Sequence, residues 1–267
     1  SMMGTTEWIM TNRDINYKEY PKLAKTFYPS EFDADAWVKA IKAAGAKYIT
    51  ITTRHHDGFS LFKTATSSYN SVDGSPFKRD IIKEMADACQ RNGIKLHLYY
   101  SHLDWGREDY PVGRTGTGTG RPKEKANWAS YYKFMNTQLT ELLTNYGKVG
   151  AIWFDGWWDH DSDAKPFDWQ LEEQYALIHK LQPQCLIGNN HHHTPFPGED
   201  IQIFERDLPG ENKAGLSGQS IGRLPLESCQ TINEHWGYNI TDTLYKSPKE
   251  LIQMLVRAAG KNANLLL

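Results

Sequence analysis

The side chains best suited to chemistry in this sequence stand directly after short apolar runs. Two adjacent histidines, His55 and His56, follow the run KYITITTR, and Asp155 follows the run VGAIWF. Imidazoles can donate and accept hydrogen bonds, and a carboxylate held at the end of an apolar strand can act as a nucleophile. The pattern therefore indicates a site for binding or catalysis that is assembled from strand ends.

Two further apolar runs also end in polar and aromatic residues. The run IKLHLYYS has Tyr99 and Tyr100 near its end and is followed by His102, and the run LIGNN is followed by three histidines at positions 191–193. Packing alone does not explain why several independent apolar runs turn polar and aromatic at the same point. We therefore expect these strand ends to meet in one site.

If Asp155 is a nucleophile in glycoside hydrolysis, it needs a second carboxyl group. A retaining glycosidase places its two carboxyl groups about 5 to 5.5 Å apart, and an inverting one about 6.5 to 9.5 Å apart. The candidates downstream are Glu205 in FERD, Glu211 in LPGEN and Glu227 in PLESC, and separation along the sequence does not measure that distance. The alternative interpretation is that Asp155 only caps the helix that follows it.

The histidines could instead bind a metal. Adjacent side chains on an extended segment point to opposite sides, so His55 and His56 chelate one ion together only if the backbone turns between them. The sequence contains no H-E-x-x-H motif, and its three cysteines are too widely separated for a zinc site or a disulfide framework. We therefore expect no metal and no other cofactor, and interpret the imidazoles as hydrogen-bond partners for hydroxyl groups.

Helical and strand-like segments alternate along the chain. Apolar residues recur at helical spacing in residues 33–45, 80–93, 129–147, 170–183 and 247–260. Short strand-like runs lie at residues 47–52, 94–101, 149–156, 185–190 and 262–267. This alternation predicts a parallel sheet, and the absence of a dinucleotide fingerprint favours a (β/α)8-type barrel in one domain over residues 1–267. In such a barrel the catalytic groups follow the carboxyl ends of the strands.

Charge and hydropathy exclude several classes of partner. The formal net charge is −2 without a long basic run, which argues against a nucleic-acid partner. No run approaches about 18 apolar residues, so we expect no membrane-spanning segment. Residues 107–127 are rich in glycine and threonine and predict a long flexible loop over the active face, which acts either as a lid or as a passive insertion.

Three motifs, in the order KYITITTRHHDGFSLF, GAIWFDGWW and LESCQTINEHWGYN, resemble the α-L-fucosidases of glycoside hydrolase family 29. The resemblance extends over nearly the whole chain. It implies a (β/α)8-like barrel, fucosylated glycans as substrates, and release of terminal fucose with retention through a covalent fucosyl-enzyme.

The resemblance also assigns roles to residues. It implies that Asp155 is the nucleophile and that His55 and His56 contact the fucose hydroxyls. The acid/base is expected to be Glu211, with Glu205 next, while Glu227 shapes the site. Further sugar contacts are implied for Tyr100, Trp153, Glu7, Trp8 and Trp236.

The sequence departs from the family pattern at three points. No His-Trp-Gly strand precedes TTEW, and no β-sandwich follows NANLLL, so we expect a barrel that lacks its first strand and a C-terminal β-sandwich. The edges left by such a gap would be covered by a homo-oligomer partner or by a replacement element. His191 stands near the position where many members carry an arginine, and we expect it to contact the substrate in its place.

Two alternative functions remain open at this stage. The chain could be a fucose-binding protein of the same fold with impaired or no turnover, or a metal-dependent barrel hydrolase. The N-terminal SMMGTTEW has no signal-peptide pattern. If a signal peptide has been removed from this end, we expect a periplasmic, secreted or lysosome-like location.

Overall fold

Seven parallel strands follow one another in chain order around the structure, a computed structural model that describes residues 6–267. The first sheet contains β1 (Tyr48–Arg54), β2 (Lys95–Ser101), β3 (Ala151–Asp155) and β4 (Leu186–Asn189), and the second contains β5 (Gln202–Glu205), β6 (Leu226–Cys229) and β7 (Ala263–Leu266). A single parallel bridge between Gly188 and Ile201 joins the sheets. In the described residues β7 does not pair with β1, so the sheet stays open there.

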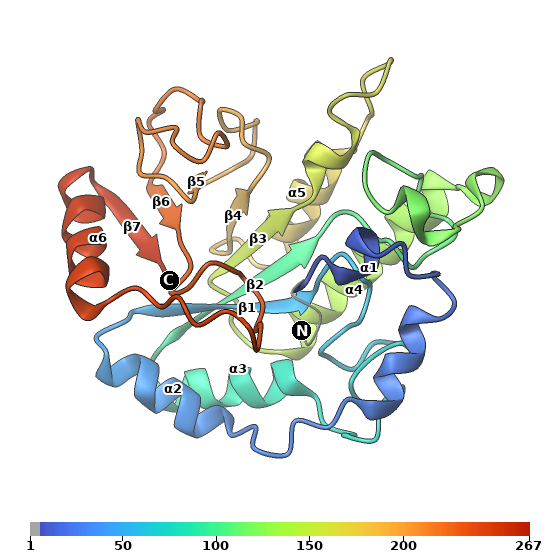
Figure 1. Ribbon diagram of the computed structural model, residues 1–267, viewed down its shortest axis with the longest axis horizontal. Helices are drawn as coiled ribbons and strands as arrows, with labels where there is room; N and C mark the ends of the chain where they lie inside the picture. The colour runs from blue at the N-terminus through green and yellow to red at the C-terminus, as the bar shows by residue number, and fades with distance from the viewer. Residues whose placement is uncertain (1–5) are drawn as a thin grey trace.

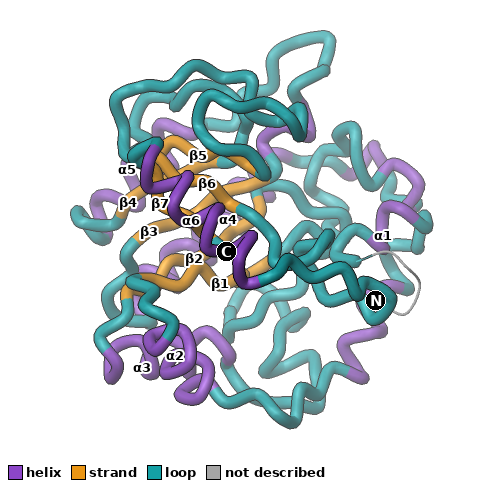
Figure 2. The backbone as a smooth tube through the Cα atoms, turned by 60° about the vertical axis from the view of Figure 1, so that its left-hand side comes forward, coloured by secondary structure: helices purple, strands orange, loops and turns teal. Residues whose placement is uncertain are grey.

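Helices lie outside the strands (Figures 1 and 2). They are α1 (Ile9–Asn12), α2 (Ala34–Ala43), α3 (Ile81–Asn92), α4 (Trp128–Asn145), α5 (Leu171–Leu181) and α6 (Pro248–Gly260). Short 3-10 helices occupy Tyr20–Thr26, Thr117–Thr119, Lys123–Lys125 and Trp157–His160. In Figure 1, α2 and α3 pack together below β1 and β2, and α6 lies against β7. These features confirm the predicted α/β class, and the parallel sheets fit an open (β/α) barrel.

The helix ends follow local signals in the sequence. The Asp33 side chain accepts a hydrogen bond from the amide of Ala36 and so caps α2. Ser247 and Glu250 form a reciprocal capping box at the start of α6. Gly93 ends α3 with a φ of 67°, a left-handed conformation that suits glycine. These caps explain why the predicted helices agree with the structure to within a few residues.

The second sheet was not predicted completely, because β5 and β6 were missed. Each is only four residues long, and their sequences, QIFE and LESC, mix polar with apolar residues. Residues 206–225, which connect them, contain no helix, so the alternation on which the prediction depended is interrupted. Whether a homo-oligomer partner covers the open edge between β7 and β1 stays a prediction.

Residues 107–127 form a packed loop instead of a free one. The Thr115 amide and hydroxyl both donate to Oδ1 of Asp159. The Arg121 guanidinium donates to the Tyr110 carbonyl, and both Tyr110 and Thr119 are fully buried. These contacts give no support to the expected flexibility, and they hold Arg114 at the edge of the cavity described below.

Candidate active site

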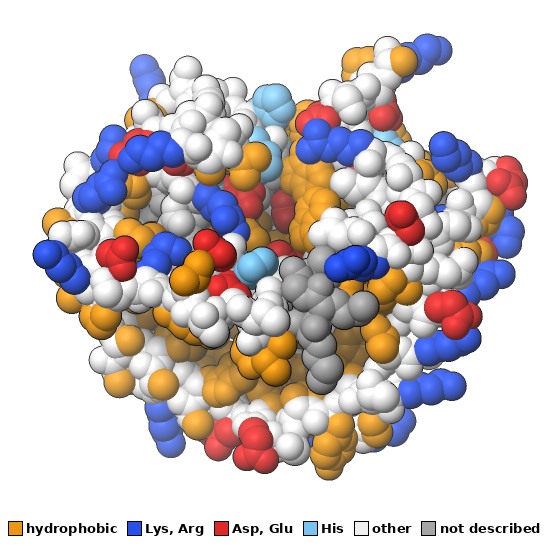
Figure 3. Space-filling view, in the orientation of Figure 1, with side chains coloured by type: hydrophobic (Ala, Val, Ile, Leu, Met, Phe, Trp, Pro, Cys, Tyr) orange, Lys and Arg blue, Asp and Glu red, His pale blue; other side chains and the backbone are white. Residues whose placement is uncertain are grey.

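A cavity of about 570 Å³ lies at the carboxyl ends of the strands. Figure 3 shows it as the central hollow of one face, with acidic side chains inside. Every strand except β4 contributes a lining residue of its own, and Asn190 follows β4 directly. The shared polarity of the strand ends in the sequence therefore reflects one common site.

Asp155, the last residue of β3, is held by contacts from three segments. The Tyr99 hydroxyl of β2 donates to Oδ2 over 2.8 Å, and Nε1 of Trp158 donates to Oδ1 over 3.0 Å. Nε2 of His56 lies 3.5 Å from Oδ2. These contacts fix both carboxylate oxygens in position, with the side chain only 13% exposed.

The pKa of Asp155 is raised above its ordinary value. Burial is the main cause, and the negative charge of Glu205 adds to it. The hydrogen bonds from Tyr99 and Trp158 and the nearby His55 act in the opposite direction by stabilising the ionised form. Asp155 is therefore a desolvated carboxyl group whose charge depends on its neighbours.

His55 and His56 both line the cavity, with ring centroids 4.0 Å apart. They lie after the last residue of β1, where the backbone turns, so the alternation of an extended strand no longer separates them. Nδ1 of His56 contacts the Ser101 hydroxyl at 2.7 Å, whereas the buried Nδ1 of His55 has no partner within residues 6–267. Burial lowers the pKa of both imidazoles, which leaves them neutral hydrogen-bonding groups.

Glu205, the last residue of β5, is a second carboxyl group in the cavity. Its Oε2 atom accepts from Nδ2 of Asn190 over 2.7 Å and contacts Nε2 of His192 at 2.8 Å. Burial acts to raise the pKa of Glu205, but the hydrogen bonds from His192 and Asn190 outweigh it, so the net shift is downward.

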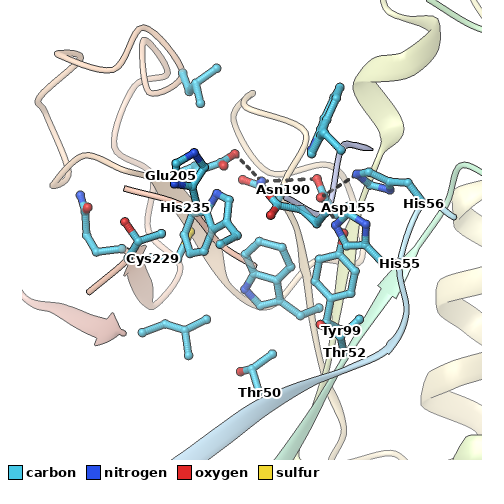
Figure 4. A pocket seen from close by; sticks show the side chains of 18 of the residues that line it. Thr50, Thr52, His55, His56, Tyr99, Asp155, Asn190, Glu205, Cys229 and His235 are labelled. Carbon is cyan, nitrogen blue, oxygen red and sulfur yellow. Dashed lines mark hydrogen bonds and ion pairs between the residues drawn. The ribbon is translucent and has the colours of Figure 1, made fainter. Parts of the chain in front are cut away.

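Asn190 connects the two carboxyl groups. Its Nδ2 atom lies 2.7 Å from Oε2 of Glu205 and 3.4 Å from Oδ1 of Asp155. These distances keep Oε2 of Glu205 and Oδ1 of Asp155 within about 6 Å of each other, so the two carboxyl groups face the same part of the cavity. Figure 4 shows Glu205, Asn190, Asp155 and His56 following one another across the cavity.

Comparison with known proteins identifies the family. The model of the family described as alpha-L-fucosidase matches residues 1–267. The chain belongs to the α-L-fucosidase family. It is 36% identical over 259 residues to putative alpha-L-fucosidase 1 of Oryza sativa subsp. japonica, covering 90% of this chain and 46% of that protein. It is 32% identical to the tissue alpha-L-fucosidase of Mus musculus, covering 93% and 52%. The chain thus spans about half the length of the curated relatives it matches.

Solved α-L-fucosidase structures have the same fold. Isoenzyme 1 from Paenibacillus thiaminolyticus superposes with a TM-score of 0.83 at 36% identity, covering 98% of this chain and 63% of that one. AlfC from Lactobacillus casei, in complex with its α-L-fucose product, gives a TM-score of 0.82 at 29% identity, covering 98% and 79%.

Several residues singled out by the likeness to α-L-fucosidases do meet in this cavity. Its lining includes His55, His56, Asp155, Glu205, Glu7, Trp8, Trp153 and Trp236. Trp8 stacks on Trp158 with ring centroids 5.6 Å apart. Oε2 of Glu7 accepts a hydrogen bond from the Gly237 amide. Their shared location is consistent with the predicted roles, which stay predictions.

Tyr100 does not line the cavity, and its expected sugar contact requires correction. β2 pairs with β3 so that Tyr99 is opposite Trp153 and Tyr100 is opposite Phe154. Because strand residues alternate between faces, Tyr99 points to the cavity and Tyr100 to the core. The Tyr100 hydroxyl is buried against α4, where it donates to Oε1 of Gln138 over 2.7 Å.

Glu211 also lies outside the cavity, which removes the basis for preferring it as the acid/base. Its carboxylate pairs with Arg257 of α6 at 2.6 Å and with Lys213 at 3.1 Å. The hydrogen bond from Lys213 is the largest cause of its lowered pKa. The loop after β5 directs Glu211 towards α6, whereas Glu205 at the end of β5 faces Asp155.

His191 and Glu227 are placed differently from the expectation as well. His191 is buried, with Nε2 3.0 Å from Glu199, and the next residue, His192, faces the cavity. Glu227 accepts from the Tyr48 hydroxyl over 2.5 Å and from Nε1 of Trp153 over 2.8 Å. Glu227 lines a separate cavity with the first residues of β1 and β2, and its partner Trp153 lines the cavity that contains Asp155.

Sequence reasoning did not assign roles to Tyr99, Trp158, Asn190, His192 or Arg114, all of which line the cavity. The period of two along β2 and β3 carried a signal for Tyr99, because it places Tyr99, Trp153 and Asp155 on one face. Nothing comparable distinguishes His192 from its two histidine neighbours. Within residues 6–267, no group of three or more metal-ligating side chains forms a metal site, and no helix is long and apolar enough to span a membrane.

Proposed function

We propose that this chain releases terminal α-L-fucose from fucosylated glycans, with retention, through a covalent bond between fucose and Asp155. The observation that carries the proposal is the pair of carboxyl groups, Asp155 and Glu205, joined by Asn190 inside one cavity. Two carboxyl groups on one cavity can act as the nucleophile and the acid/base of a retaining glycosidase. The family of the chain supports fucose as the sugar.

The first step transfers fucose to the enzyme. An oxygen of ionised Asp155 bonds to the anomeric carbon while the bond to the glycosidic oxygen breaks, and Glu205 gives its proton to that departing oxygen. In the second step Glu205 takes a proton from water as the water oxygen displaces Asp155. His55 and Asn190 both line the cavity, where an imidazole and an amide can hydrogen-bond to the sugar hydroxyls.

The pKa directions in the structure run opposite to the order that the first step needs. The pKa of Asp155 is raised, mainly by burial, and that of Glu205 is lowered by its donors, so a proton shared between them favours Asp155. A sugar seated against Glu205 removes its carboxyl group from water and raises its pKa. The first step therefore requires that the proton is on Glu205 in the substrate complex.

Hydrolysis of 4-nitrophenyl α-L-fucoside tests the proposal. We expect the wild-type chain to turn over this substrate and to form β-fucose only by a later mutarotation, with α-fucose as the first product by NMR. Asp155→Asn retains the size of the side chain but lacks the nucleophilic charge, so we expect its turnover to fall to background.

Three outcomes would contradict the proposal. Unchanged turnover in Asp155→Asn would reject the nucleophile. Fucose binding by the wild type without any hydrolysis would favour the binding-protein alternative. Loss of wild-type activity on treatment with a chelator, and its return with metal, would favour the metal-dependent hydrolase.

A further inference from the structure

Only one oxygen of Glu205 is engaged by neighbouring side chains. Oε2 contacts Nε2 of His192 at 2.8 Å and Nδ2 of Asn190 at 2.7 Å. Within the part of the chain that the structure describes, Oε1 has no hydrogen-bond partner. The carboxylate is thus anchored through one oxygen, and its other oxygen remains available.

An unusual backbone accompanies this contact on both sides. His192 has a φ of 68° and Arg206, directly after Glu205, has a φ of 60°. Residues other than glycine rarely adopt the left-handed backbone conformation, and those that do are concentrated at functional sites. The left-handed turn coincides with different environments for neighbouring histidines: His191 is buried against Glu199, whereas His192 faces Glu205.

We propose that His192 is a positioning residue for Glu205, which together with Asn190 holds Oε2 so that Oε1 is the oxygen that exchanges the proton with the glycosidic oxygen. This inference rests on the proposed function, because it concerns the acid/base of that reaction. A carboxylate anchored through one oxygen cannot rotate freely, and restricting its orientation favours proton transfer along one direction.

The proton transfers balance around Oε1. In the first step the bond from Oε1 to hydrogen breaks and the departing glycosidic oxygen gains that hydrogen, which leaves Glu205 ionised. In the second step Oε1 takes a hydrogen from the attacking water as the fucosyl bond to Asp155 breaks. His192 keeps its own Nε2 hydrogen in both steps, donates it to Oε2, and does not touch the reacting atoms.

The charge on Glu205 responds to groups from several elements. His192 and Asn190 come from the segment after β4, and Arg206 follows Glu205 in the chain; all three lower its pKa. Asp155 of β3 and Cys229 of β6 also interact with it electrostatically, as does Tyr99 of β2. Removal of the His192 donor therefore raises the pKa of Glu205.

The test uses His192→Ala and His192→Gln in the full chain. The Gln amide nitrogen can occupy the place of Nε2 and donate to Oε2 without titrating. Each variant is assayed on 4-nitrophenyl α-L-fucoside and on phenyl α-L-fucoside, whose poorer leaving group needs more help from the acid. His193→Ala is the matched control, because His193 is exposed, contacts the Trp157 and Phe196 rings, and does not line the cavity.

We expect His192→Ala to lower kcat/KM for the phenyl substrate by about tenfold or more, because it removes part of the total effect of general acid catalysis. We expect a smaller loss of kcat/KM for the nitrophenyl substrate. The basic limb of its pH profile should move to higher pH, because the acid keeps its proton longer. His192→Gln should restore most of the rate, and His193→Ala should behave as the wild type.

A second measurement does not depend on activity. The carboxyl carbon of Glu205, labelled with carbon-13 and assigned with Glu205→Gln, should titrate at higher pH in His192→Ala than in the wild type. Two results would overturn this inference and leave the proposed function intact. In the first, the wild type is active and His192→Ala loses the same activity on both substrates. In the second, the titration of Glu205 is unchanged in His192→Ala. An inactive wild type would overturn the proposed function, and the titration would still decide whether His192 controls Glu205.

Discussion

The two parts of the strand order build opposite sides of the cavity in different ways. From β1 to β4 each strand leads to the next through a segment that contains a helix, and this part supplies the two histidines, Tyr99 and Asp155. From β5 to β7 the strands are four residues long. Residues 206–225 connect β5 to β6 without a helix, and the long loop of residues 230–246 precedes α6 on the way to β7. This second part supplies Glu205 and Trp236.

The difference extends to burial. His56 is 1% exposed and contacts Ser101 and Asp155, whereas Trp236 is 44% exposed. Regular βα units give the nucleophile a rigid and desolvated environment. Loops tolerate sequence change and motion more readily, so in the proposed reaction we expect the side that carries Glu205 to be the more adaptable one.

The largest effect is expected when each of the two candidate acids is removed in turn. Glu205→Ala should lower kcat/KM for phenyl α-L-fucoside about a hundredfold or more, because general acid catalysis contributes on that scale. With 4-nitrophenyl α-L-fucoside, whose leaving group needs little acid, azide should restore turnover by attacking the fucosyl-enzyme without a general base, and should form fucosyl azide. Glu211→Ala should retain wild-type kinetics, because its ion pairs with Arg257 and Lys213 lie outside the cavity.

Loss of activity in Glu211→Ala with wild-type kinetics in Glu205→Ala would contradict this comparison. It would mean that the loop after β5 moves to bring Glu211 into the cavity, so that the structured end of β5 is not the source of the acid.

A smaller effect separates the two tyrosines at the end of β2. Tyr99→Phe removes a hydrogen bond to a charged carboxylate, worth about 1.5 to 3 kcal/mol, so kcat should fall about tenfold to a hundredfold. Tyr100→Phe leaves Oε1 of Gln138 unsatisfied in the core, so the free energy of unfolding should fall by about 1 to 3 kcal/mol. Its kcat per folded molecule should not change.

Steady-state kinetics and urea unfolding of both variants measure this contrast. If Tyr100→Phe lost activity while remaining fully stable, the division between cavity face and core face in the first four strands would be wrong.

The smallest expected effect is a shift of the pH profile. Asp155 must be ionised to attack. Because its pKa is raised, activity should be lost on acidification at a higher pH than it would be with an aspartate of ordinary pKa. Glu205→Gln removes one negative charge that contributes to this rise, so the acidic limb should move to lower pH. The measurement uses 4-nitrophenyl α-L-fucoside, whose leaving group depends least on an acid.

An acidic limb that stayed in place in Glu205→Gln would show that the two carboxyl groups do not interact. The two sides of the cavity would then act independently.

Prediction from the sequence succeeded where local signals determine structure. Asp33 and Ser247 cap their helices by contacts within one turn, and the apolar runs of β1 to β4 form strands. The choice of Tyr100 over Tyr99 followed the family likeness and was wrong, because the register between β2 and β3 places Tyr99 on the face of Asp155. In the second part, β5 and β6 were too short and too polar to give such a signal.

Local patterns in the sequence are enough to predict the α/β class, the helix ends, and the position of Asp155 and the two histidines at strand ends. These features follow from spacing and capping within a few residues. The packing of distant segments places Glu205 and not Glu211 near Asp155, and it turns His192 and not His191 towards the cavity. These choices depend on the left-handed turn at His192, and on contacts such as that between Arg257 and Glu211, 46 residues apart. Such contacts form only when distant segments pack together, and no local pattern encodes them.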